Sequence, residues 1–310
     1  MSPLRLLPVL LIAPLMMVLV GCATHDDFDF ETCGVRPRYS LPITFEQVPM
    51  VEAHIGGTRL RLILDTGSTG IVLTDAAVHA ASLGTDGRRV LTSRGIGGTV
   101  RSFAGQLRGF TIGALEVPDH EIQVAPALAG ADGLFGQSVL SVFEVDLDIR
   151  HRTATLYAGR LCPQTVVPPW SFPYSTLDAA GSESGRFLIP VTLQGRPITA
   201  LLDTGAATTV VARDVATSLG ITDAMLAAGP QSQLKGLGAA TPIASLYRFS
   251  DLRIGEESYA APLLVGPRAD PHFDMILGSD FLAGHRVWLS YARKRVYIER
   301  GAGSAPRPGA

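Results

Sequence analysis

The sequence predicts an all-β protein that contains two copies of one unit. The composition combines 33 Gly and 21 Pro with many short runs of Val, Ile, Leu and Thr, which favours strands and turns over helices. The stretch "LILDTGSTGIVLT" at 62–74 sets an Asp-Thr-Gly turn between two apolar runs. The stretch "ALLDTGAATTVVA" at 200–212 repeats this pattern.

The repeat extends well beyond these turns. At an offset of 138 residues, Gly57 aligns with Gly195 and Asp65 with Asp203, without a gap. A later pair of blocks, "DGLFGQSVLSVFEVDLD" at 132–148 and "DMILGSDFLAGHRVWLS" at 274–290, aligns at an offset of 142. Because two long segments match in the same order, we interpret the chain as a duplication.

Each element follows from its local pattern. β-branched and apolar runs bounded by Gly and polar residues predict strands, and each predicted strand has a counterpart in the other copy. The first copy should have strands at 47–56, 59–65 and 70–74, and the second at 187–194, 197–203 and 208–212. Short helices are expected at 75–83, 137–142, 213–219 and 279–283.

The predicted domain organisation has six parts. They are a signal peptide at 1–21, a tether at 22–42, a first lobe at 43–160, a Pro-, Ser- and Gly-rich linker at 161–185, a second lobe at 186–300 and a disordered tail at 301–310.

The amino terminus has the features of an export signal. Fifteen apolar or Pro residues follow Arg5, fewer than the roughly 20 that a membrane span needs. The following "LVGC" at 19–22 resembles the lipobox of bacterial lipoproteins, which implies cleavage before Cys22 and acylation of its thiol. Ala23 then favours the outer membrane within a periplasm-facing cell envelope. An ordinary secretory signal and an uncleaved anchor are the alternatives.

Charge and cysteine content narrow the function classes. The formal net charge of −2 comes without a run of Lys and Arg, so it gives no reason to expect nucleic acid or an anionic membrane surface as a partner. No HExxH or CxxC spacing predicts a metal site, and we expect no metal and no cofactor. In an exported protein, Cys33 and Cys162 would form a disulfide, with two unpaired thiols as the alternative.

Two aspartates on matched turns predict acid–base chemistry. A carboxylate at the end of an apolar strand is costly to bury, and a pseudo-two-fold arrangement of the copies would bring Asp65 and Asp203 face to face. Two carboxyl groups a few ångströms apart titrate as a pair that holds one proton over a wide pH range. Such a pair can activate a water molecule and protonate a carbonyl oxygen.

At these residues the sequence resembles the retropepsin-like branch of the aspartic peptidases, over roughly residues 45–300. The resemblance rests on the two DTG turns, the blocks "LFG" (134–136) and "ILG" (276–278), and two Gly-containing segments. It implies two pseudo-symmetric β-barrel lobes with the active site at their interface. It also implies a monomer that acts as an intramolecular pseudo-dimer and cleaves polypeptides.

The resemblance assigns roles to individual residues. Asp65 and Asp203 would be catalytic, and Thr66 and Thr204 would hydrogen-bond across the interface. The apolar-apolar-Gly blocks would support the turns from behind. The remaining turn residues would be Gly67, Ser68, Gly205 and Ala206, and the flaps over an extended substrate would include Gly95, Ile96, Gly97, Gly98, Gly236, Leu237 and Gly238.

Several features depart from the better-known relatives. Viral retropepsins are dimers of a single copy, whereas here the two copies are fused. Each copy has its own flap-like segment, whereas pepsin has a single flap. The turns also differ, because the first reads DTGST and the second DTGAA. We hypothesise that the Ser68 hydroxyl hydrogen-bonds Asp65, stabilises its ionised form and leaves the proton on Asp203.

The sequence therefore predicts a lipid-anchored aspartic endopeptidase. Two other classes remain open, a retropepsin fold that binds peptides without cleaving them and a tethered envelope scaffold. The glycine segments are either flaps or plain hairpins.

Overall fold

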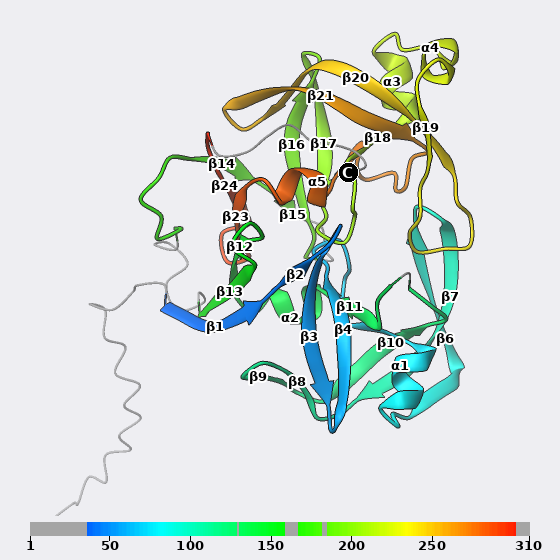
Figure 1. Cartoon of the computed structure of the whole chain (residues 1–310), viewed down its shortest axis with the longest axis vertical. Coiled ribbons are helices and arrows are strands. Elements are labelled where there is room, and N and C mark those ends of the chain that lie inside the picture. Colours follow the sequence, from blue (N-terminus) through cyan, green and yellow to red (C-terminus); the bar gives the residue numbers. More distant parts are fainter. Residues whose placement is uncertain (1–35, 129, 159–166, 182–184, 302–310) are drawn as a thin grey trace, which may run out of the picture. The chain divides into compact units, whose positions relative to one another are not determined.

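The computed structural model of the protein describes residues 36–128, 130–158, 167–181 and 185–301 (Figure 1). The expected signal peptide, Cys22, the Cys33–Cys162 pair and nearly all of the expected tail lie outside these residues. Within the described part, no helix has the length and apolar character needed to cross a membrane.

The first lobe contains one large sheet in the order β6-β7-β10-β5-β11-β4-β3-β8-β9, with β2 beside β3. The strands predicted at 47–56, 59–65 and 70–74 are present as β3 (Pro49–Ile55), β4 (Thr58–Leu64) and β5 (Val72–Thr74). The other strands are β2 (Thr44–Phe45), β6 (Thr85–Gly95), β7 (Gly98–Leu107), β8 (Phe110–Ile112), β9 (Leu115–Val117), β10 (His120–Ala125) and β11 (Gly133–Phe135).

The second lobe repeats this arrangement in the order β15-β16-β17-β22-β18-β21-β20-β19. A further pairing between β16 and β20 closes six of these strands into a barrel. The predicted strands are β16 (Phe187–Leu193), β17 (Arg196–Leu202) and β18 (Val210–Ala212). The others are β15 (Ala180–Gly181), β19 (Gln231–Gln233), β20 (Ile243–Ile254), β21 (Glu257–Gly266) and β22 (Met275–Leu277).

Five short helices lie among the described residues. Four of them match the predicted helices, and α4 (Asp223–Ala227) was not expected. Its N-cap is Thr222, whose side chain accepts a hydrogen bond from the Met225 amide, so a capping signal was present in the sequence. The matching helices are α1 (Asp75–Ala80), α2 (Gln137–Leu140), α3 (Arg213–Ser218) and α5 (Ser279–Leu282).

A third sheet joins the lobes and includes strands from the segments expected to be the tether and the linker. Its order is β1-β13-β12-β23-β24-β14, so two strands of the first lobe lie beside two strands of the second, with β1 and β14 at the edges. β1 lies in the expected tether and β14 in the expected linker, so neither segment is only a connector. The strands are β1 (Arg36–Pro42), β12 (Glu144–Asp148), β13 (Thr153–Ala158), β14 (Tyr174–Asp178), β23 (Arg286–Ser290) and β24 (Arg295–Glu299).

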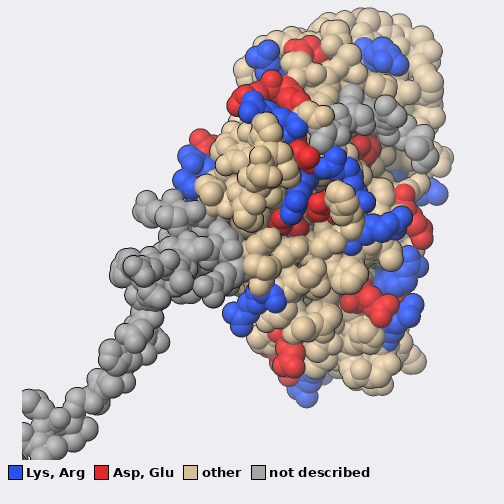
Figure 2. Space-filling model, turned by 60° about the vertical axis from the view of Figure 1, so that its left-hand side comes forward, with Lys and Arg blue, Asp and Glu red and all other residues tan. Residues whose placement is uncertain are grey.

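Charged side chains cover much of the surface as mixed pairs. On the face shown in Figure 2, Lys and Arg lie interspersed with Asp and Glu. Such exposed pairs contribute little to stability individually.

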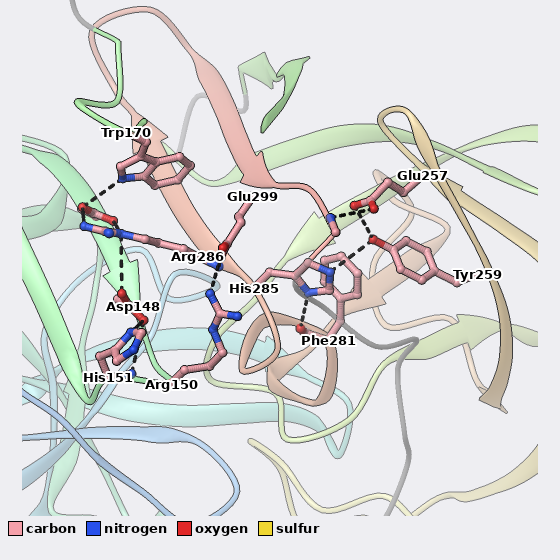
Figure 3. Close-up of polar contacts among 12 residues, drawn as sticks. Asp148, Arg150, His151, Trp170, Glu257, Tyr259, Phe281, His285, Arg286 and Glu299 are labelled. Carbon is pink, nitrogen blue, oxygen red and sulfur yellow. Dashed lines mark hydrogen bonds and ion pairs between the residues drawn. The ribbon is translucent and has the colours of Figure 1, made fainter. Parts of the chain in front are cut away.

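One cross-lobe pair differs because it is largely buried. Arg286 of β23 contacts both carboxylate oxygens of Asp146 on β12, at 3.0 and 2.7 Å, and the Asp146 side chain is 1% exposed. The Trp170 ring covers the Arg286 guanidinium at 5.4 Å, and the Trp170 indole nitrogen donates to Asp146 (Figure 3). The segment around Trp170 therefore packs onto the contact between the two lobes.

Candidate active site

Asp65 and Asp203 occupy equivalent positions, each directly after a buried strand. The backbone N–H of Asp65 donates to the carbonyl of Phe135, and that of Asp203 to the carbonyl of Leu277. Each aspartate then accepts two backbone hydrogen bonds on Oδ1, from residues two and three positions later in its own turn. These bonds fix one carboxylate oxygen of each residue and set the orientation of both side chains.

The two turns meet so that each carboxyl group lies against the glycine of the opposite turn. A Cβ added to Gly67 would lie 2.5 Å from Cγ of Asp203, and one added to Gly205 would lie 2.5 Å from Cγ of Asp65. Any side chain at either position would collide with the carboxyl group. Both turns therefore require glycine at this position, because the carboxyl group of the opposite turn lies directly against its backbone.

Burial and proximity raise the pKa values of both aspartates. For Asp65, burial is the largest cause and repulsion from Asp203 adds to it, so its pKa lies well above 3.8. Burial also raises the pKa of Asp203, while the Gly205 amide, the bond to Asp65, the Ala206 amide and the Arg186 charge act in the opposite direction. Asp203 lies close enough to act on Asp65, so the ionisation of one carboxyl group disfavours the ionisation of the other.

Thr66 and Thr204 make the cross-lobe hydrogen bonds expected of them. The amide of each threonine donates to the hydroxyl of the other at 3.0 Å. The Thr66 hydroxyl donates to the Leu202 carbonyl at 2.9 Å, and the Thr204 hydroxyl donates to the Leu64 carbonyl at 2.5 Å. All four bonds are buried and hold the two turns in register.

The apolar-apolar-Gly blocks lie behind the turns, as expected. A Cβ on Gly136 would come within 2.7 Å of the Ser68 carbonyl oxygen, and one on Gly278 within 2.9 Å of the Ala206 carbonyl oxygen. The next residue of each block also supports a turn, a role that sequence reasoning missed. Gln137 donates a side-chain hydrogen bond to the Thr66 carbonyl, and Ser279 donates one to the Thr204 carbonyl.

The proposed hydroxyl bond from Ser68 to Asp65 is not made. The Ser68 hydroxyl donates to the Gly70 carbonyl at 3.1 Å, and only the Ser68 amide donates to Asp65, at 2.9 Å. Ala206 supplies the equivalent amide to Asp203. The hypothesis is therefore wrong, because the turn backbone directs the hydroxyl toward its own chain.

The two glycine segments touch each other at their tips. Gly95 and Gly98 pair at the end of the β6–β7 hairpin, while the second segment lies in the connection from β19 to β20 (Figure 1). The Gly97 amide donates to the Leu237 carbonyl and the Gly97 carbonyl accepts from the Ala240 amide, both at 3.0 Å. A Cβ on Gly236 would lie 2.7 Å from Ile96.

Ile96 links the tip of the β6–β7 hairpin to the wall of the second lobe. It lines a small pocket with Val210 of β18 and Ile276 of β22, two strands that pair beside the Asp203 turn. Sequence reasoning also missed Arg186, whose guanidinium lies 3.8 Å from the carboxylate of Asp270 and whose charge reaches Asp203. Among the described residues, no cluster of three or more His, Cys, Asp or Glu could hold a metal ion.

The comparisons with known proteins agree with this geometry. The family model described as aspartyl protease matches residues 51–139 and, a second time, residues 189–281. One match falls in each lobe, and together they cover more than half of the chain. The comparison with curated proteins found no significant match. With two matches in register with the duplicated turns, the chain belongs to the aspartyl protease family and carries its domain twice.

Proposed function

We propose that the protein is an aspartic endopeptidase whose catalytic residues are Asp65 and Asp203. The observation that supports this most is the close approach of two carboxyl groups that both have raised pKa values. A structural role would not require two acidic groups to face each other, because their repulsion destabilises the fold.

The pair supplies a base and an acid at the same time. The ionised carboxylate removes a proton from a water molecule, which attacks the carbonyl carbon of the peptide bond. The protonated carboxyl group donates to the carbonyl oxygen. The amides of Gly67, Ser68, Gly205 and Ala206 hold the inner carboxylate oxygens while the proton moves.

The substrate in this proposal is an extended polypeptide segment with apolar residues near the cut. Apolar side chains line the second-lobe pocket, and the equivalent wall of the first lobe has Val72, Ala125 and Leu134. Strand addition beneath the flaps would bind the substrate backbone. Because the flap tips hydrogen-bond each other, they must separate to admit a chain.

The proposed location is the periplasm-facing cell envelope, where a lipid on Cys22 anchors the protein. We also propose that the protein is a monomer. Support for the anchor comes from the apolar stretch and the "LVGC" sequence. Metabolic labelling with a palmitate analogue tests this, since labelling of the wild type should be lost in Cys22→Ser. Equal labelling of both would contradict acylation at this residue.

Cleavage of β-casein with and without pepstatin tests the catalytic proposal. Wild-type protein should cleave, pepstatin should inhibit, and Asp65→Asn and Asp203→Asn should each lower the rate about 100-fold or more. Asp75→Asn is the matched control, because this exposed aspartate begins α1 away from the turns.

Turnover that persists in both Asn variants would contradict the proposal. Folded wild-type protein that binds pepstatin or peptides but cleaves none of a broad peptide library would favour the non-catalytic binding function.

A further inference from the structure

The hairpin that carries the first flap has an unusual charge distribution. From Thr85 to Leu107 the hairpin has four arginines and a single acidic residue, Asp86, near its start. The whole chain has 26 basic and 28 acidic residues, and on the face in Figure 2 both signs are interspersed. The hairpin is therefore a local concentration of positive charge in a chain of slightly negative net charge.

Strand register places two of these arginines on one exposed face. Val90 pairs with Phe103, Thr92 with Arg101, and Arg94 with Thr99, and directly opposed residues share a face of the sheet. All six side chains are exposed. Together these residues form the outer face of the hairpin: Val90, Thr92, Arg94, Thr99, Arg101 and Phe103.

The opposite face of the hairpin is covered by the protein itself. The Gln123 amide of β10 hydrogen-bonds the hydroxyls of Ser93 and Ser102. This contact covers part of the inner face, whereas the outer face is exposed along its length.

The arginines of the outer face have no acidic partner in the described part of the chain. Arg89, in the bulge near the start of β6, pairs with Glu121 at 2.5 Å, but no ion pair joins Arg94 or Arg101 to a described carboxylate. Phe103 and Val90 lie on the same face, nearer the base of the hairpin than Arg94 and Arg101. Their exposed fractions are 39% and 42%. Cationic groups beside exposed apolar side chains match a surface of anionic headgroups above acyl chains.

We propose that the outer face of the β6–β7 hairpin docks on an anionic phospholipid surface. The arginines contact lipid phosphates, and Phe103 and Val90 enter the boundary between headgroups and acyl chains. A bilayer fits this face better than an acidic peptide, which would pair with the arginines but leave Phe103 and Val90 exposed to water. Docking would place the flap tips next to the membrane and favour substrates that emerge from it.

Vesicle co-sedimentation tests the proposal without reference to catalysis. Residues 34–310 form a compact unit that contains the whole described core, so this fragment removes the amino-terminal apolar stretch from the assay. It should bind vesicles that contain phosphatidylglycerol and leave vesicles of phosphatidylcholine alone unbound. High salt should release it, because screening weakens contacts between exposed charges.

Matched charge reversals locate the binding surface. Arg94→Glu with Arg101→Glu should weaken vesicle binding at least about tenfold. Arg248→Glu with Arg253→Glu, two exposed positions on β20, should change it by less than about twofold. Thermal unfolding of each variant verifies the fold, and Phe103→Ser provides a second test that leaves the charge unchanged.

The full chain provides an independent measurement. In proteoliposomes, Trp fluorescence of a Phe103→Trp variant should be quenched by brominated phosphatidylglycerol more than that of the wild type. Binding that is equal on neutral and anionic vesicles, or lost equally in the β20 variant, would overturn the proposal. So would binding to polyglutamate without binding to phosphatidylglycerol vesicles, which would indicate an acidic polypeptide as the partner.

Discussion

Asp65 and Asp203 are buried acidic residues that the fold keeps close together. Asp65 is only 8% exposed, and the charge of Asp203 acts on it. Burial and repulsion both disfavour ionisation, so these residues lower stability at neutral pH. The backbone amides of the two turns offset part of this cost, because they donate hydrogen bonds to both carboxyl groups.

The stability cost of Asp65 should depend on pH. Its folded pKa lies above the unfolded value of 3.8, so the folded state binds more protons between the two values. The contribution of Asp65 to stability is therefore most favourable below about pH 3.8 and is lost as pH rises through its raised pKa. Asp65→Asn should unfold at a higher temperature than the wild type at neutral pH, by a few degrees, and show a smaller gain at about pH 3.

Thermal unfolding at both pH values measures this difference. Asp75→Asn serves as the control, because Asp75 is exposed and lies outside the two DTG turns. An Asp65→Asn effect of the same size at both pH values would mean that the carboxyl group titrates normally.

At the scale of elements, the turn and the block behind it form one unit in each lobe. Sequence reasoning predicted these elements because the repeat aligns them and because each strand has a distinctive apolar pattern. It did not predict that Gln137 and Ser279 support the threonine carbonyls, since different residues perform the same task in the two lobes. It also misassigned the Ser68 hydroxyl, whose direction depends on the path of residues 68–70.

The cross-lobe threonine bonds should affect both stability and catalysis. Thr66→Val preserves the shape but removes a donor to the Leu202 carbonyl and an acceptor from the Thr204 amide. We expect a loss of about 1–3 kcal/mol of unfolding free energy, because buried backbone groups lose partners. Peptide cleavage should also fall, since the register of the two carboxyl groups changes.

Thr66→Ser is the matched variant, because it retains the hydroxyl. Denaturant unfolding and cleavage assays on both proteins separate the hydrogen bond from packing. If Thr66→Val and Thr66→Ser have the same unfolding free energy and cleavage rate, the threonine hydrogen bonds do not hold the turns in register.

At the scale of the whole molecule, the lobes are joined by more than the active-site turns. The six-stranded sheet takes strands from the amino terminus, both lobes and the segment between them. Its pairings, such as β12 with β23, join segments about 140 residues apart. The sequence did not reveal this sheet because β1 and β14 lie outside the repeat and have no turn signal to identify their partners.

The buried pair at this junction should contribute to stability far more than an exposed pair. Arg286→Gln leaves Asp146 buried without its guanidinium, and we expect a loss of about 3–5 kcal/mol. Arg295→Gln, which breaks the exposed pair with Asp178 on β14, should have a much smaller effect, because water screens this pair. Denaturant midpoints of the two variants test this, and equal midpoints would show that the Arg286 contact does not hold the lobes together.

The central claim is that Asp65 and Asp203 form one coupled acid–base pair. Carbon NMR titration of the aspartate carboxyl groups, in the wild type and in Asp203→Asn, measures this directly. The account predicts a raised pKa for Asp65 in the wild type that falls when the negative charge at position 203 is removed. A pKa for Asp65 close to 3.8 that does not respond to this substitution would contradict it.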